Sequence, residues 1–242
     1  MVFVSINTWK CDGNYHRRLS LMTEELLGLS VDIIAAQEVF HAPSTETSTK
    51  NHLTDYLGLA NYYLPLRRKK RALDNQTVDS YSGLCFFTNL PVVCHDHFML
   101  PSHPADGERA AQLLVIKQNE KKIALVNTHL THLSDQSNLR VQQVRTILGQ
   151  VTQDTDWDAV IIAGDFNALP DSPVVTEVNH LMVDAFSRHI QPTHRSGKRI
   201  DYIFYTPDAG LKVVEQKRVL DQAEYGIYPS DHYGLLVKFD IE

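Results

Sequence analysis

The sequence has no excess of positive charge, no paired cysteine motif and no long apolar segment. Its 23 Lys and Arg residues are outnumbered by 29 Asp and Glu residues, which gives a formal net charge of −6. This balance argues against a protein that coats nucleic acid non-specifically, although it does not exclude a metal-dependent nuclease. The three cysteines, Cys11, Cys85 and Cys94, form no CxxC pair. The apolar neighbours of Cys85 and Cys94 predict buried thiols.

The N-terminus does not resemble a signal peptide, because Met1 is followed at once by the apolar residues of a predicted core strand. No apolar run approaches the ~18 residues that a membrane-spanning helix needs. We therefore expect a cytoplasmic protein without a transmembrane segment. Nothing in the sequence points to a protein partner.

The composition that is present is typical of a globular domain. The chain has 242 residues, of which 43% are hydrophobic and 21% are charged, and a chain of this length sustains a core without disulfides. It contains no internal repeat, no low-complexity tract and no linker. We therefore expect one domain over residues 1–242.

Hydrophobic periodicity predicts strands that alternate with helices. The expected helices cover residues 16–29, 52–59 and 137–151, and a Ser/Thr-rich loop covers 41–51. The expected strands cover 2–6, 31–36, 82–87, 112–117, 122–127, 159–163, 200–205 and 235–239, with a hairpin turn at Asn119-Glu120. The first strand–helix–strand unit predicts a right-handed crossover between two parallel strands. Together these elements indicate a layered α/β domain.

Polar side chains gather where the predicted strands begin or end. The series comprises Asn7, Gln37-Glu38, Thr128-His129, Gly164-Asp165-Phe166-Asn167, Ile200-Asp201-Tyr202 and Ser230-Asp231-His232. A single Asp or His at a strand end is usually a loop or capping residue. Ligand sites of α/β sheets, however, lie beyond the carboxyl ends of strands, and the complete series indicates such a site.

In content and order, the series resembles the motifs of the endonuclease/exonuclease/phosphatase superfamily, and the resemblance extends over residues 3–239. It implies a four-layer α/β sandwich, in which helices flank two central mixed β-sheets and the site lies at one edge. It also implies metal-dependent hydrolysis of a phosphate ester, with Mg²⁺ as the expected cofactor and Mn²⁺ as an alternative.

Hydrolysis of a phosphate ester needs a hard cation, an activated water and donors for the growing negative charge. Mg²⁺ needs few protein ligands and prefers oxygen, so Glu38 with Asn7 beside it fits such a site. Asp231 is a further candidate ligand, directly or through water. His232 is the expected general base, because an imidazole titrates near neutral pH.

The resemblance implies roles for the other members of the series. Asp201 would orient His232 through its second ring nitrogen. Asp165 would position the attacking water, and Asn167 and His129 would donate hydrogen bonds to the phosphoryl oxygens. The choice of base between Asp165 and His232 stays open.

Other segments carry weaker signals. Tyr81 resembles a family tyrosine that reaches the phosphate, or it packs at a strand start. Arg109 is a possible phosphate contact, with a solvated loop cation as the alternative. The basic run at residues 67–71 either cradles a polyanionic substrate or is a solvated loop. Arg140 and Gln143 match an Arg-x-x-Gln pattern and are expected to hold their helix to the neighbouring rim.

Thr128-His129 favours the deoxyribonuclease-, sphingomyelinase-, deadenylase- and phosphatase-like branches over apurinic-site endonucleases, which typically lack this histidine. We expect a nucleic-acid phosphodiester as the substrate, with a small organic phosphate or a phospholipid headgroup as the alternative. A non-catalytic binding module on the same fold is a third hypothesis. The complete set of candidate ligands and bases argues against it.

Overall fold

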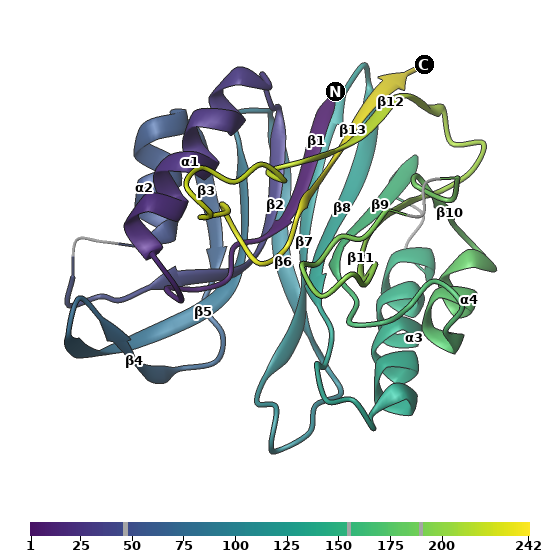
Figure 1. Ribbon diagram of the computed structural model, residues 1–242. Helices are drawn as coiled ribbons and strands as arrows, with labels where there is room; N and C mark the ends of the chain where they lie inside the picture. Colours follow the sequence, from purple (N-terminus) through teal and green to yellow (C-terminus); the bar gives the residue numbers. More distant parts are fainter. Residues whose placement is uncertain (46–47, 154–155, 189–190) are drawn as a thin grey trace.

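The computed structural model describes residues 1–45, 48–153, 156–188 and 191–242, and two β-sheets form its centre (Figure 1). The first sheet has the order β12-β13-β1-β2-β5-β3, and β4 pairs with β5 beside this path. Its strands are β1 (Val2–Asn7), β2 (Ile33–His41), β3 (Ala60–Leu64), β4 (Lys69–Leu73), β5 (Gln76–Thr88), β12 (Leu211–Val219) and β13 (Gly234–Ile241). The second sheet has the order β10-β11-β9-β8-β7-β6. Its strands are β6 (Val92–Leu100), β7 (Arg109–Gln118), β8 (Lys121–His129), β9 (Ala159–Asp165), β10 (Val183–Asp184) and β11 (Asp201–Tyr205).

Helices cover the outer faces of the two sheets (Figure 1). The first sheet carries α1 (Tyr15–Gly28) and α2 (Thr49–Leu57), and the second carries α3 (Ser137–Gln153) and α4 (Pro173–Asn179). Alternation along β1 shows why the layers form. Phe3 packs in the core between the sheets, whereas Val4 packs with Met22 and Leu26 of α1. Strands that are buried on both faces are apolar throughout, and the protein is the four-layer α/β sandwich that the sequence predicts.

The strand pairings at the centre of the sheets agree with the prediction from the sequence, whereas several strands at the sheet edges were not predicted. β1 and β2 are parallel, and Asn119 and Glu120 form the turn between β7 and β8. Periodicity did not predict β3, β4, β6, β10, β12 or α4. β6 lies at a sheet edge and is mostly exposed, so it lacks an apolar stripe. Cys94 on β6 is therefore exposed, against expectation, while Cys11 and Cys85 are buried.

Local capping explains a shifted helix boundary. The helix expected at residues 52–59 is α2, which begins at Thr49 because the Ser48 side chain accepts a hydrogen bond from the Asn51 amide as N-cap. The start of α2 therefore lies inside the stretch that was expected to be a loop. None of the helices formed by the described residues is long and apolar enough to cross a membrane.

Arg18 on α1 anchors two segments that border the functional edge of the sandwich. Its side chain is only 1% exposed. The guanidinium donates hydrogen bonds of 2.8 to 3.2 Å to the carbonyls of Thr8, Trp9, Lys10, Asp12 and Pro229. Because the guanidinium is a rigid fork of donors, it fixes the loop after β1 against the segment that precedes β13.

We predict that Arg18→Lys lowers the free energy of unfolding by at least about 2 kcal/mol, because one ammonium group cannot replace five donors and leaves buried carbonyls unpaired. Urea denaturation measures the change. Arg145→Lys is the matched control, since Arg145 is exposed on α3 and pairs with Glu177, and such pairs contribute at most about 1 kcal/mol. Equal losses in the two variants would contradict the anchoring role of Arg18.

Candidate active site

Strands from both sheets end at the same edge of the sandwich. β1 ends at Asn7, and the parallel ladder of β8 and β9 sets His129 beside Asp165. The Asn7 side-chain amide donates a hydrogen bond of 3.1 Å to Asp165 Oδ2 across the gap between the sheets. Parallel pairing therefore converts residues that are far apart in sequence into neighbours, as expected for ligand sites of α/β sheets.

A cavity of about 550 Å³ opens at this edge. The predicted site residues that line it are Asn7, Glu38, His129, Asp165, Asn167, Asp231 and His232. The other lining residues are Trp9, Lys10, Asp12, Arg67, Lys69, Arg71, Ala72 and His132. The basic run at 67–71 thus contributes three side chains to the cavity, which favours a substrate-binding role over a solvated loop.

Asp201 lies behind His232 and orients its ring. His232 Nδ1 lies 2.9 and 3.1 Å from the two Asp201 carboxylate oxygens, and Thr193 donates a hydrogen bond of 2.6 Å to the same carboxylate. His232 Nε2 lies 3.7 Å from Asp165 Oδ2. Burial lowers the pKa of His232, but Asp201 and Asp165 outweigh burial and raise this pKa to about 10. The two carboxylates thus favour the protonated form of the His232 ring in this arrangement, and the choice of base between Asp165 and His232 stays a prediction.

Asp165 sits at the centre of the site and is 2% exposed. It follows Gly164, where a Cβ atom would lie 1.9 Å from the Thr128 carbonyl oxygen, so only glycine lets β8 and β9 approach here. The backbone amide of Asn167 donates a hydrogen bond of 2.9 Å to Asp165 Oδ1. Burial and the charge of Asp201 raise the pKa of Asp165 to about 7, against the opposing effect of His232. A carboxylate with such a pKa exchanges protons near neutral pH.

His129 presents a nitrogen to the cavity. Its Nε2 is buried and finds no hydrogen-bond partner among the described residues, although Asp165 Oδ2 lies 3.4 Å away. Burial and the charge of Arg109 hold the pKa of His129 well below its usual range, so the ring is neutral. A buried polar atom without a partner calls for an explanation, and contact with a ligand supplies one.

A β-bulge directs Glu38 into the cavity. The register between β2 and β5 shifts between Ala36 and Val39, and Glu38 has a φ of 53°. Bulges of this kind redirect side chains and are common beside active sites. Glu38 Oε2 lies 3.2 Å from Lys10 Nζ. Lys10 also has a left-handed backbone conformation, with a φ of 43°. The sequence did not predict this ion pair.

The donors on this side of the cavity suit a hard divalent cation, which prefers carboxylate and amide oxygens. Glu38 and Asp231 supply carboxylates, and Asn7 supplies an amide oxygen that accepts a hydrogen bond of 3.0 Å from the Trp9 amide. Two groups of described residues, neither of which includes Glu38 or Asn7, hold ligand atoms within 4.8 Å of one another: His194, Asp231 and His232, and Asp165, Asp201 and His232. The residues present therefore fit a metal ion.

His194 is a site neighbour that sequence reasoning missed. Its Nε2 lies 3.6 Å from Asp231 Oδ2, and its ring packs edge-on against His232 with centroids 4.6 Å apart. The residue belongs to an irregular segment that reaches His232 through an isolated β-bridge. No strand or helix pattern in the sequence marks such a segment.

Arg109 is neither a solvated cation nor placed to bind phosphate. It is 2% exposed and donates hydrogen bonds of 2.7 and 2.8 Å to Asp106. A further hydrogen bond of 3.0 Å reaches the carbonyl of His129. Most of its donors are engaged in this way, and Arg109 is not among the residues that line the cavity.

Tyr81 also lies outside the cavity lining. Side chains alternate along β5, and Arg71 contacts Ser80 and Ser82 on the cavity side of the strand. Tyr81 therefore points to the face opposite Ser80 and Ser82, and its contact with a phosphate stays a prediction. Arg140 and Gln143 behave as expected, because they bind backbone groups of Thr131, Leu133 and Pro101 and so tie α3 to the rim.

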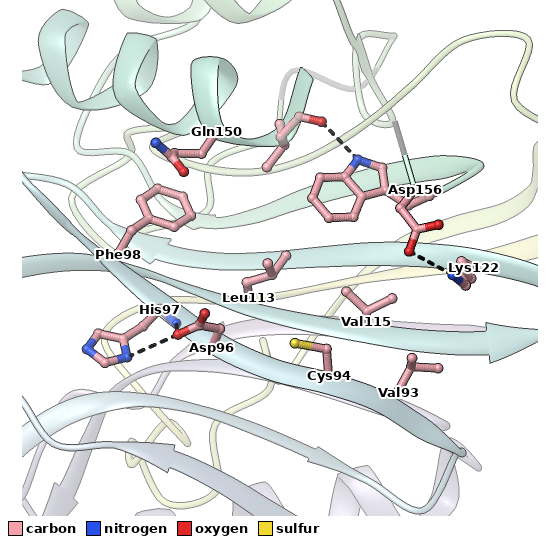
Figure 2. A pocket seen from close by; sticks show the side chains of 12 residues that line it. Val93, Cys94, Asp96, His97, Phe98, Leu113, Val115, Lys122, Gln150 and Asp156 are labelled. Carbon is pink, nitrogen blue, oxygen red and sulfur yellow. Dashed lines mark hydrogen bonds and ion pairs between the residues drawn. The ribbon is translucent and has the colours of Figure 1, made fainter. Parts of the chain in front are cut away.

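A second cavity, of about 660 Å³, lies between α3 and strands β6 and β7. Figure 2 shows Phe98, Leu113 and Val115 lining it together with charged residues. One of these, Lys122, is already paired with Asp156 at 2.7 Å. The lining contains no member of the strand-end series, so the candidate chemistry belongs to the cavity at the strand ends.

That cavity supplies what hydrolysis of a phosphate ester requires, namely a proton acceptor, donors to the phosphoryl oxygens and hard oxygen ligands. Fold and site together define a phosphoesterase. A model of the Endonuclease/Exonuclease/phosphatase family matches residues 4–232, and the chain belongs to this family.

Known proteins that resemble the chain agree with this assignment. Tyrosyl-DNA phosphodiesterase 2 of Gallus gallus is 25% identical over 154 residues, which cover 53% of this chain and 42% of that protein. The chain thus spans less than half the length of this curated relative. The human Nocturnin catalytic domain, solved with a bound sulfate anion, has a TM-score of 0.78 at 22% identity. The match covers 100% of this chain and 93% of the Nocturnin chain. A mannosyl-6-phosphatase of Bacteroides thetaiotaomicron has a TM-score of 0.74 at 16% identity, with 100% of both chains covered.

We predict that Asp106→Asn destabilises the fold in a pH-dependent manner. Burial raises the pKa of Asp106, but hydrogen bonds from Arg109 and Thr131 outweigh it and lower this pKa to about 2. An unfolded Asp has a pKa of about 3.9. The stabilisation is therefore complete above that pH and is lost as the pH falls toward the folded-state value.

The variant should lower the free energy of unfolding by on the order of 2 kcal/mol at neutral pH, and less as the pH falls below about 4. Urea denaturation at a series of pH values measures both effects. Asp79→Asn, at an exposed position, is the control and should change stability little. A pH-independent loss in Asp106→Asn would refute the ion-pair explanation.

Proposed function

We propose that residues 1–242 act as one catalytic domain that hydrolyses nucleic-acid phosphodiesters with a divalent cation, Mg²⁺ or in its place Mn²⁺. The surroundings of Asp165 carry this proposal. Its Oδ2 lies 3.1 Å from the Asn7 amide nitrogen, 3.4 Å from His129 Nε2 and 3.7 Å from His232 Nε2. An amide, a neutral imidazole and an imidazolium thus converge on one carboxylate. The cytoplasmic location expected from the sequence stays a prediction.

Glu38, Asn7 and Asp231 would hold the cation. When bound, the cation neutralises the non-bridging oxygens of the phosphate. The Lys10 ammonium, which neutralises Glu38 in the structure, would then be free to face the phosphate. The strained backbone at Lys10 and Glu38 supports this assignment, because strain of this kind is concentrated at functional sites.

Asp165 is the proposed general base, and Asp201 is a positioning residue for His232. Asp165 takes the proton of the attacking water, and the His232 imidazolium donates a hydrogen bond to a phosphoryl oxygen. Asn167 Nδ2 donates one hydrogen bond of 3.2 Å to the Leu130 carbonyl, so its second N–H group is available to the same phosphate. His129 Nε2 completes the set of contacts to the phosphoryl group.

Two observations support a diester of nucleic acid as the substrate. Cationic side chains from residues 67–71 line the cavity, and a relative that matches about half of the chain is named tyrosyl-DNA phosphodiesterase 2. A small organic phosphate is the second candidate, because a cavity of about 550 Å³ lies in the range of small-molecule sites. The mannosyl-6-phosphatase with the same fold is consistent with that candidate.

We predict that Glu38→Gln abolishes metal-dependent turnover, because a neutral amide does not replace a carboxylate ligand. Bis-p-nitrophenyl phosphate and p-nitrophenyl phosphate are the substrates, each with Mg²⁺, Mn²⁺ or EDTA. Faster cleavage of the diester supports the first candidate, and faster cleavage of the monoester supports the second. Wild-type turnover in Glu38→Gln would remove this residue from the metal site.

We predict that Asp165→Asn lowers kcat for the preferred substrate at least ~10²-fold, because it removes the proposed proton acceptor. His97→Gln, on the exposed part of β6, is a control for the assay. Circular dichroism and urea denaturation of both variants check that the fold is retained. A decrease of only a few-fold in folded Asp165→Asn would transfer the role of base to another residue.

A further inference from the structure

One wall of the active-site cavity carries three cations that the proposed chemistry does not use. Arg67, Lys69 and Arg71, here called the cationic wall, lie in and just before β4. Lys69 and Arg71 are two residues apart on one strand, so their side chains share a face. Among the described residues, no carboxylate forms an ion pair with either of them. Their charge is therefore available to a ligand in the cavity.

Arg71 is held in place by neutral groups. Its two terminal nitrogens donate hydrogen bonds of 2.8 Å to Ser80 Oγ and 2.9 Å to Ser82 Oγ. Ser80 in turn donates a hydrogen bond of 2.9 Å to the Lys69 carbonyl. The hydroxyl groups orient the guanidinium but do not neutralise it. A charged donor that is already oriented binds an anion at a lower entropic cost.

Arg67 is a partly desolvated cation without adequate compensation. Its side chain is 14% exposed, and its terminal nitrogen lies 3.8 Å from Asp106 Oδ1, an oxygen that Arg109 already contacts at 2.7 Å. Its Nε atom is buried and has no hydrogen-bond partner in the described part of the chain. Burial and the charge of Arg109 lower the pKa of Arg67. Partly buried cations that share a carboxylate at long distance are costly, and an anionic ligand would lower that cost.

Lys69 and Arg71 lie on a strand that is not adjacent to β1 and its terminal Asn7, whereas the charge of Arg67 also acts on Glu38 and His129. Arg71 is bound to β5, which is two strands away from β1 and its terminal Asn7. Neighbouring strands are about 4.8 Å apart, so the two places are on the order of 10 Å apart. This spacing leaves room for a second anionic group of the substrate beside Lys69 and Arg71.

We propose that Arg67, Lys69 and Arg71 bind a second phosphate group of the substrate, distinct from the phosphate that is cleaved. The preferred substrate is then a phosphodiester that carries a further phosphate on the adjoining nucleoside. This inference rests on the proposed function, because it takes the site around Asp165 as the place of cleavage. It also assigns specificity to β4, a strand that the sequence did not predict.

Two substrates that differ by one phosphate test the proposal. Thymidine 5′-(p-nitrophenyl phosphate) and its 3′-phosphorylated form contain the same scissile ester and release the same p-nitrophenolate. The wild-type kcat/KM should be at least about tenfold higher for the 3′-phosphorylated substrate, since hydrogen bonds to charged groups contribute about 1.5 kcal/mol or more. In the double variant Lys69→Gln/Arg71→Gln, this ratio should fall toward one.

Lys70→Gln is the matched control, because Lys70 lies between the two residues on the same strand but does not line the cavity. It should retain the wild-type ratio. A wild-type ratio near one, or a high ratio that persists in the double variant, would overturn the proposal.

A binding measurement separates this proposal from the proposed function. Isothermal titration compares thymidine 3′,5′-bisphosphate with thymidine 5′-monophosphate, and no turnover is required. Wild type should bind the bisphosphate at least about tenfold more tightly, and the double variant should not. If neither nitrophenyl substrate is cleaved but the binding difference is found, the proposed function fails while the anion site stands. Equal affinities in the wild type would refute the cationic wall as a phosphate subsite.

Discussion

The hydrogen bond between Asn7 and Asp165 joins the two sheets at the place where the site forms, and the arrangement of the other residues depends on it. Asn7 ends a strand of the first sheet and Asp165 a strand of the second, with 3.1 Å between the amide nitrogen and the carboxylate oxygen. Deeper in the core, the Gln37 side chain donates a hydrogen bond of 2.8 Å to Asn127. Polar pairs in an apolar interface are costly when misaligned. They therefore fix one relative placement of the sheets.

Buried arginines extend the same control to the segments around the site. Arg18 satisfies carbonyls of the loop after β1, and Arg109 holds the carbonyl of His129 while it pairs with Asp106. Neither guanidinium faces the substrate cavity. Carbonyl groups of irregular segments would otherwise need water as a hydrogen-bond donor, and the two arginines take the place of that water. The proposed site residues can therefore lie next to loops and still keep a defined position.

For one physical reason, the sequence predicted the centre of the fold and most of the candidate residues that line the cavity. Strands that are buried on both faces are continuous apolar runs, and the ends of such strands converge, so Asn7, His129 and Asp165 could be expected at one rim. Edge strands such as β6 and β12 have few buried residues and leave no periodic signal. The sequence also did not show in which direction a given side chain points. A bulge aims Glu38 into the cavity, and the pleat of β5 turns Tyr81 away from it.

The distribution of charge was the hardest property to predict from the sequence, because the net charge of a chain does not show where its charged side chains gather in the fold. A chain with a net charge of −6 still concentrates Arg67, Lys69 and Arg71 in a cavity that also contains Glu38, Asp165 and Asp231. The carboxylates suit a cation and the basic side chains suit an anion. A substrate with a single phosphate, bound together with a divalent ion, would leave the cationic wall without a partner. The presence of both charges in one cavity thus favours a substrate that is itself anionic beyond the bond that is broken.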